Sequence, residues 1–347
     1  QWNHDFHVVL NKALDLGMTV GVTSGTNWNT TNVPGLNPDS QSAMQTVLEM
    51  HETVSAGTAL ENHAIPTSKT SSGGCGGSTT ITVKDAAQWV GAYAYKVVDA
   101  AAKPQVLGDP IDVSAYVTEA DGVRTISWTV PDDGDYQIFY LWMQGTYQAS
   151  SPAVQPSYCV NYLDQRGFEA WAEYFKANVL NDPELNEKIK NGDVQLFMDS
   201  LEYNDGDGMT IYSEHFAEDF QARKGYDIRP YLILASGLDG MLWLWQRTEY
   251  SGGTYTLTDR NLAMRIHDDL FDVQTQLYME NLLEPMEQWL NDYGIELRAQ
   301  ISYGKYLEIS EPSMAVDYPE AENLNQNNQV DMYRLWSGAA KLENKVL

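Results

Sequence analysis

The chain has 347 residues, of which 43% are hydrophobic and 11% aromatic, so it is long enough to bury a large core and is globular rather than disordered. Its formal net charge of −27 argues against nucleic acid and anionic membrane surfaces as partners. No apolar run reaches the roughly 18 residues that a membrane-spanning helix needs, so no membrane span is expected.

The cysteine content and the first residues bear on the compartment. Strong acidity with only Cys75 and Cys159 favours a secreted protein, either extracellular or periplasmic. A bridge between the two would contribute roughly 4–5 kcal/mol by chain entropy, and two reduced thiols are the alternative. The chain starts at Gln1 without an initiator Met or a signal peptide, which predicts a processed start.

The first 65 residues have an α/β pattern. Apolar residues recur at helical spacing over residues 3–16, and Met18–Val22 is a strand-length apolar run. Residues 23–29 then form a polar loop containing Asn27 and Trp28. Residues 40–54 are predicted to be a second short helix, from Met44, Val47, Leu48 and His51.

The pattern changes at about residue 66. A Ser/Thr/Gly-rich stretch holds Cys75 and is followed by short β-type runs separated by turn signals, at residues 80–83, 92–98, 124–130 and 136–142. The sequence therefore predicts three parts: residues 1–65 as the first part of an α/β domain, 66–150 as an inserted antiparallel β module, and 151–347 as the rest of the α/β domain.

The third part resumes the alternation of helix and strand. A helix over residues 164–180 precedes the strand 194–198, whose carboxyl end carries Asp199 and Glu202. A further helix starts at Ile211, with Tyr212, Phe216 and Phe220 four residues apart on one face.

A long helix is predicted over residues 260–290, with a kink or break at Pro285. The strand 295–300 follows, with Gln300 and Tyr303 at its carboxyl end and then a loop through Asp317, Glu320 and Glu322. The chain finishes with a helix over residues 329–341 and the start of a strand at Lys345.

Polar side chains thus follow three predicted strands, at residues 23–29, 199–205 and 300–322. Strands that alternate with helices and carry their polar residues at one end are the signature of a (β/α)8 barrel of the TIM type. We expect that fold, with the β module inserted into it.

Several segments in chain order carry a family resemblance. They are LGMTVGVTSGTNWN, ISWTVPDDGDYQIFYL, VNYLDQRGFEAW, FMDSLE with EDFQARKGYDIRPYL, ELRAQISYGK and DYPEAE. In their order and spacing they resemble the α-L-rhamnosidases of glycoside hydrolase family 106. The resemblance implies an inverting, exo-acting α-L-rhamnosidase that acts on a plant or microbial polysaccharide or oligosaccharide.

The resemblance also implies two features of the site. Calcium is expected near the sugar hydroxyls, with Asp199, Asp317, Glu320 and Glu322 able to supply some of the six to eight oxygens it needs. Members of the family are longer than this chain, so the barrel is expected to be incomplete within these residues. The second catalytic glutamate would then fall a few positions after Leu347, leaving Glu320 as a ligand rather than the base.

The residue types fit this chemistry, because glycoside hydrolysis needs one protonated and one ionised carboxyl on either side of the scissile bond. Glu202 is the candidate general acid: Phe197 and Tyr203 are near it in sequence, and an apolar wall raises the pKa of a carboxyl group. Its alternative role is to cap a helix. Glu320 is the second catalytic candidate, with a metal or substrate ligand and a structural residue as alternatives. The candidate substrate-binding residues are Asn27, Trp28, Asp199, Gln300, Tyr303 and Glu322.

Two other functions stay open at this stage. The first is a carbohydrate-binding relative without activity, in which aromatic side chains hold a sugar and the acids only bond to its hydroxyls. The ten Trp and 21 Tyr fit this reading, although they fit a buried aromatic core equally well. The second is a polysaccharide lyase, in which tyrosines act on uronates.

Overall fold

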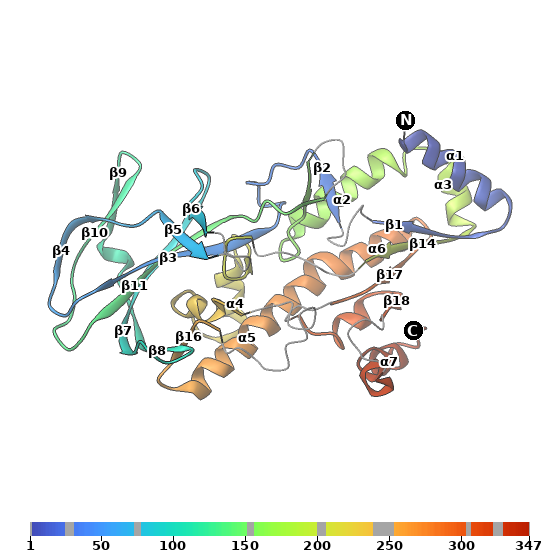
Figure 1. Cartoon of the computed structure of the whole chain (residues 1–347). Helices are drawn as coiled ribbons and strands as arrows, with labels where there is room; N and C mark the ends of the chain where they lie inside the picture. The colour runs from blue at the N-terminus through green and yellow to red at the C-terminus, as the bar shows by residue number, and fades with distance from the viewer. Residues whose placement is uncertain are drawn as a thin grey trace.

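The computed structural model of the chain describes residues 2–24, 31–72, 78–150, 156–199, 206–238, 253–302, 307–321 and 329–346. Figure 1 shows antiparallel strands gathered at one end of the molecule and a group of parallel strands with helices at the other. A long helix runs between the two ends. The fold is therefore mixed α/β, with β-structure in both halves.

A parallel sheet occupies the helical end of the molecule. Its strands, in spatial order, are β1 (Thr19–Thr23), β14 (Asp193–Met198), β17 (Ile295–Ala299) and β18 (Tyr318–Pro319). All three pairings are parallel, so the carboxyl ends of the four strands lie along the same edge. The segments that follow β1 and β18 are almost 300 residues apart in the sequence, yet both start at this edge.

The two faces of this sheet differ. Alternate residues of β14 and β17, such as Leu196 and Leu297, are buried. The helices α1 (Trp2–Asp15), α3 (Pro183–Lys190) and α6 (Glu284–Asp292) contact strands β1, β14 and β17 respectively. On the opposite face, Phe197 and Arg298 are neighbours across the strands and are only half-buried. This face of the sheet therefore carries partly exposed polar and aromatic side chains, as a binding site requires.

The helices start and end where local chemistry requires. Helix α2 (Gln165–Asn178) begins after Asp164, whose carboxylate accepts a hydrogen bond from the Arg166 backbone. Trp171 of α2 stacks on Phe175 and packs edge-on against Trp289 of α6. This aromatic cluster joins the two helices.

The remaining helices follow the same rules. Helix α4 (Phe216–Lys224) ends at Gly225 with φ 82°, the left-handed cap that favours glycine. The predicted long helix is α5 (Arg260–Tyr278) continuing into α6, and the π-helical turn η3 (Met279–Leu283) lies just before Pro285. The other helical segments are η1 (Ser114–Tyr116), η2 (Arg229–Ala235), η4 (Pro312–Ala315), η5 (Val330–Tyr333) and α7 (Arg334–Leu342).

The antiparallel end consists of two facing sheets. The larger contains, in order, β15 (Ile211–Tyr212), β3 (Gln45–Val54), β11 (Tyr136–Gly145), β7 (Gln88–Asp99), β8 (Gln105–Asp112) and β16 (Tyr255–Leu257). The smaller contains β4 (Ala59–Ala64), β10 (Val123–Thr129) and β9 (Val117–Ala120). Side chains such as Met50, Ile126 and Ile138 form a separate core in this part.

Shorter sheets complete the strand inventory. One contains β12 (Ala149–Ser150), β13 (Ser157–Cys159) and β2 (Asn32–Pro34), and the other pairs β5 (Ser68–Ser72) with β6 (Ser78–Thr82). Cys159 is buried, and its Sγ donates to the Tyr162 hydroxyl at 3.2 Å. Cys75 lies outside the described residues, so its pairing with Cys159 stays a prediction.

The predicted helix over residues 40–54 is wrong, because this segment is the long strand β3. This strand carries apolar residues on both of its faces, such as Val47 and Leu48, and the spacing of such residues also matches one face of a helix. Leu48 and Met50 face the core between the two sheets, whereas Val47 belongs to the other core. That alternation identifies a strand only once the partner strands β11 and β15 are known.

Both sheets of the antiparallel end contain strands from more than one of the predicted domains. Strands β3 and β4 precede residue 66, and β15 and β16 follow residue 150, yet all belong to the two sheets at the antiparallel end. The division at residues 65/66 and 150/151 remains a prediction about domains. Within the larger sheet, β11 pairs with β3 and β8 pairs with β16, so the strands of residues 66–150 are hydrogen-bonded on both sides to strands from the rest of the chain.

A complete (β/α)8 barrel is not found in the part of the chain that the structure describes. Strands β1 and β18 are the edges of the parallel sheet there, and β16 pairs with β8 instead of joining it. The strand expected at Lys345 is likewise absent from described residues 345–346. None of the helices among the described residues is both long and apolar enough to span a membrane.

One carboxylate of the larger sheet is buried and paired. Glu49 of β3 is only 5% exposed, and it accepts hydrogen bonds from His51 Nδ1 at 2.9 Å and Lys69 Nζ at 2.8 Å. Burial by itself raises the pKa of Glu49, but the hydrogen bond from His51 and the charge of Lys69 outweigh it and hold the pKa below its ordinary value. The ionised form is therefore the one that the fold stabilises.

We expect Glu49→Gln to lower the free energy of unfolding at pH 7 by on the order of 1 to 3 kcal/mol, because a charged acceptor of two hydrogen bonds is lost. A folded-state pKa below the unfolded one gives stability that is present above the unfolded value and lost as pH falls through the folded value. The difference from wild type in urea unfolding should thus shrink below about pH 4. Glu61→Gln, at an exposed position of β4, is the control; an equal effect there would contradict the assignment.

Candidate active site at the carboxyl edge of the parallel sheet

The carboxyl edge of the parallel sheet gathers three of the polar segments picked out in the sequence. Backbone hydrogen bonds extend the ladder one residue beyond the strands: Ser24 N to Phe197 O, Gln300 N to Met198 O, and Glu320 N to Ala299 O, at 3.0, 3.0 and 2.8 Å. These hydrogen bonds hold the residues that directly follow the strands in register with one another. Asp199, Gln300 and Glu320 lie on three consecutive strand ends.

Glu320 is the carboxylate that follows the outer strand β18. Its Oε2 lies 3.1 Å from Arg298 Nε, and its Oε1 accepts a 3.4 Å hydrogen bond from Gln300 Nε2. The Glu320 side chain is still 34% exposed, so a ligand can reach it. A carboxylate that is held by neighbouring side chains and still open to a ligand can accept hydrogen bonds, as a base or a sugar-binding residue requires.

Arg298 is a site residue that the sequence analysis did not select. It lies on β17 two positions before Gln300, so both side chains point to the same face of the sheet. Its guanidinium lies over the Phe197 ring, 4.7 Å from the ring centroid, which is a cation–π contact with the neighbouring strand. The period-two spacing of Arg298 and Gln300 was the available signal.

Residue Gln300 is buried at 6% exposure, and Ser302 beyond it at 5%. Ser302 Oγ donates to Leu307 O at 3.1 Å, which ties the chain on either side of residues 303–306 together. Tyr278 of α5 donates to Ile301 O at 3.1 Å from beneath. The segment that presents Gln300 is thus held by buried hydrogen bonds.

A short strand positions Glu320. The sequence predicted a loop through Asp317 and Glu320, but Tyr318 and Pro319 form β18 against β17. Asp317 accepts a 2.7 Å hydrogen bond from the backbone N of Leu297 and a 3.4 Å bond from Asn291. Asp317 therefore fixes the register of β18 and faces the middle of β17 rather than the carboxyl edge.

Most of the predicted site residues lie outside the described residues, and the predictions for them stand untested. These are Asn27, Trp28, Glu202, Tyr303 and Glu322. In the sequence, Asn27 follows Ser24 by three positions, and Glu202 follows Asp199 by the same number. Of the eight predicted site residues, Asp199, Gln300 and Glu320 are described, and the sheet brings all three to one edge.

The described carboxylates do not by themselves make a calcium site. In the described part of the chain, no three Asp, Glu, His or Cys side chains are grouped so that they could hold a metal ion. Asp317 is committed to the Leu297 backbone, and Glu320 to a cationic arginine, which disfavours a second cation beside it. Calcium therefore has no support from the geometry of these residues.

Comparisons with known proteins give a likeness in structure but none in sequence. No protein-family model matches the chain, and neither does any curated protein. Among solved structures, the chain is similar to one titled "Structure of Rhamnosidase from Novosphingobium sp. PP1Y", with a TM-score of 0.55 and 12% sequence identity. The match covers 91% of this chain and 42% of that one, so this chain spans about two fifths of the length of that rhamnosidase. At this identity the likeness establishes a fold shared with a glycoside hydrolase structure.

Proposed function

We propose that this chain is part of a glycoside hydrolase, an exo-acting α-L-rhamnosidase that inverts the anomeric centre. The observation that carries the proposal is the group of Glu320, Arg298 and Gln300 at the carboxyl edge of the parallel sheet. In α/β folds this edge is where ligands bind and react. The fold shared with a rhamnosidase structure supports the choice of substrate.

In this proposal Glu202 protonates the glycosidic oxygen as the bond to the leaving alcohol breaks. A water molecule attacks the anomeric carbon from the opposite face and gives its proton to the base. Glu320 is our candidate for that base. If a later glutamate takes that role, Glu320 and Gln300 instead accept and donate hydrogen bonds to the sugar hydroxyls.

The distance between the two catalytic carboxyl groups distinguishes inversion, which the family resemblance implies, from retention. Inverting pairs of carboxyl groups are about 6.5–9.5 Å apart, whereas retaining pairs are about 5–5.5 Å apart.

The test is release of 4-nitrophenol from 4-nitrophenyl α-L-rhamnoside, with the anomer of the released sugar followed by NMR. We expect release by the wild-type chain and β-L-rhamnose as the first product. Release of the α-anomer would refute inversion, and no release together with no binding of rhamnose would refute the proposal. An unsaturated product absorbing in the ultraviolet, formed from a uronate polymer, would indicate a lyase instead.

One observation favours a second candidate, a carbohydrate-binding protein without turnover. Both oxygens of Glu320 are already engaged, by Arg298 and Gln300, which suits a fixed acceptor for sugar hydroxyls as well as a base. Saturable binding of rhamnose without release of 4-nitrophenol would favour this candidate.

Calcium remains a proposal that rests on the family resemblance alone. The same assay tests it after exhaustive chelation and after calcium is added back. Loss of turnover that calcium restores would support a site that draws on Asp199, Glu320 and Glu322. An unchanged rate and an unchanged melting temperature would remove calcium from the proposal.

A further inference from the structure

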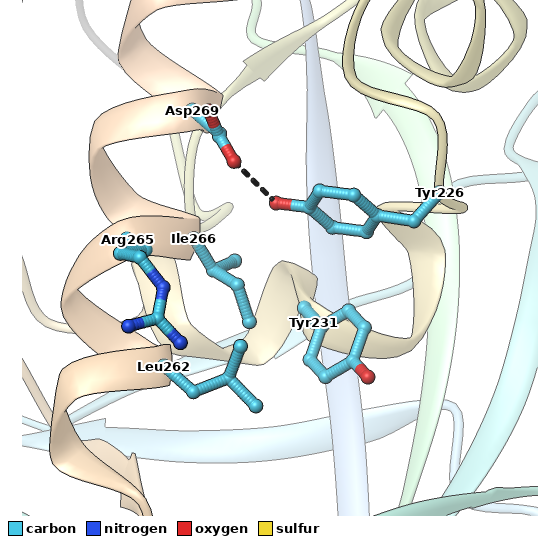
Figure 2. A pocket seen from close by; sticks show the side chains of 6 residues that line it. All are labelled: Tyr226, Tyr231, Leu262, Arg265, Ile266 and Asp269. Atoms are coloured by element: carbon cyan, nitrogen blue, oxygen red, sulfur yellow. Dashed lines mark hydrogen bonds between the residues drawn. The ribbon is translucent and has the colours of Figure 1, made fainter.

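A pocket of about 240 Å³ lies beside α5, away from the strands of the parallel sheet (Figure 2). One wall comes from helix α5 and the other from the segment around η2. The lining residues are Tyr226, Tyr231, Leu262, Arg265, Ile266 and Asp269.

The aromatic wall of the pocket is held in place. Tyr226 donates a 3.0 Å hydrogen bond to Asp269 and packs edge-on against Phe220, with ring centroids 5.0 Å apart. Tyr231 meets Tyr226 edge-to-face at 6.1 Å, so its ring is fixed by its neighbour. Tyr231 is half-buried and therefore keeps part of its surface available to a ligand.

The two charged side chains that line the pocket differ in whether they have a partner. Asp269 is already neutralised, because Lys224 Nζ lies 2.9 Å from one of its oxygens while Tyr226 bonds to the other. Arg265, in contrast, makes no side-chain hydrogen bond or ion pair with any other residue that the structure describes. The hydroxyl of Tyr231 likewise has no hydrogen-bond partner within the described ranges. The pocket thus offers an uncompensated guanidinium and a free hydroxyl.

The shape and volume of the pocket limit the size of the ligand that it can hold. Figure 2 shows Arg265 and Tyr231 on opposite sides, with the side chains of Leu262 and Ile266 between them. Drug-sized ligands occupy pockets of roughly 300–1,000 Å³, so this smaller volume suits a single ring. The site would pair the anionic group of that ring with a guanidinium and pack the apolar face of the ring on a tyrosine.

We propose that this pocket binds a uronate residue, a pyranose ring that carries a carboxylate. Arg265 binds the carboxylate, Tyr231 packs against the ring, and the Tyr231 hydroxyl donates to a ring substituent. A single guanidinium matches the single charge of a carboxylate better than the double charge of a phosphate. The choice of a sugar ring rests on the proposed function.

The experiment is an NMR titration of the full chain with sodium D-galacturonate, D-galactose and sodium acetate. Galacturonate has both ring and carboxylate, galactose lacks the carboxylate, and acetate lacks the ring. We expect saturable binding of galacturonate at least tenfold tighter than that of either other ligand. Arg265→Gln and Tyr231→Ala should each weaken it by about tenfold or more. Arg260→Gln, which removes an exposed charge from the same helix outside the pocket, should leave it unchanged.

Four results would overturn the proposal. They are absence of saturable galacturonate binding, galactose or acetate binding as tightly as galacturonate, an unchanged affinity in Arg265→Gln, and an equal loss in Arg260→Gln. Rhamnoside hydrolysis is measured separately on the same variants. If hydrolysis is absent while galacturonate binding follows the expected pattern, the proposed function fails and the pocket assignment stands; the converse result rejects only the pocket.

Discussion

Glu202→Gln should slow the release of an unactivated alcohol from an α-L-rhamnoside by about a thousandfold, within the roughly 10²–10⁴ that a general acid contributes. Gln keeps the size of the side chain but cannot donate the proton. The loss should be much smaller for 4-nitrophenyl α-L-rhamnoside, because 4-nitrophenolate leaves without a proton. Comparing kcat/KM for the two substrates therefore identifies the acid by its dependence on the leaving group.

Glu320→Gln gives the complementary result if Glu320 is the base. Activation of water is needed whatever the leaving group, so both substrates should lose activity by a similar factor, about 10²–10⁴. Glu296→Gln is the matched control. Glu296 lies on the same face of β17 as Arg298 but within the strand, where it accepts a 3.0 Å hydrogen bond from Tyr318. Near-normal activity of Glu202→Gln on the unactivated substrate would end its assignment as the acid.

The largest effect on stability is expected from a single methyl group. Gly167 lies in α2, where its added Cβ would come within 2.1 Å of the backbone O of Asn161 and within 2.9 Å of two further backbone atoms of that residue. Asn161 is fully buried and donates from its side chain to Tyr212 O at 3.2 Å, so it cannot easily move. Gly167→Ala should lower the free energy of unfolding by about 1–3 kcal/mol or more.

A second glycine provides the control. Gly338 is exposed in α7, and a Cβ there meets nothing within 4 Å. Alanine is a better helix former than glycine, so Gly338→Ala should leave stability unchanged or raise it by up to about 1 kcal/mol. Both variants are compared in urea unfolding. If Gly167→Ala were as stable as Gly338→Ala, α2 would not pack against Asn161 as closely as described.

The sequence by itself determined the elements with strong local signals. The runs that became β1, β14 and β17 are of strand length, carry apolar residues at alternate positions, and are bounded by polar residues or glycine. The helices α2 and α5 were predicted because their apolar residues repeat at helical spacing. These signals are carried by residues within a few positions of one another.

Part of the candidate site was also visible in the sequence. Asp199 and Gln300 directly follow strands, and the carboxyl ends of parallel strands meet at one edge. That argument required only the strand predictions and the rule of parallel pairing. It did not identify Arg298, because a charged residue inside a strand gives no indication of its partner until the neighbouring strands are known.

The tertiary structure alone decided which segments pair. β3 has a pattern compatible with a helix, and only its position between β11 and β15 makes it a strand. β18 is two residues long, too short for any periodic signal, and it exists because the edge of β17 is available and Asp317 bonds to Leu297. The contact of Glu320 with Arg298 depends on that pairing. Local patterns reflect neighbours in sequence, whereas strand partners and the site they create depend on residues far apart in the chain, so only the folded structure could supply them.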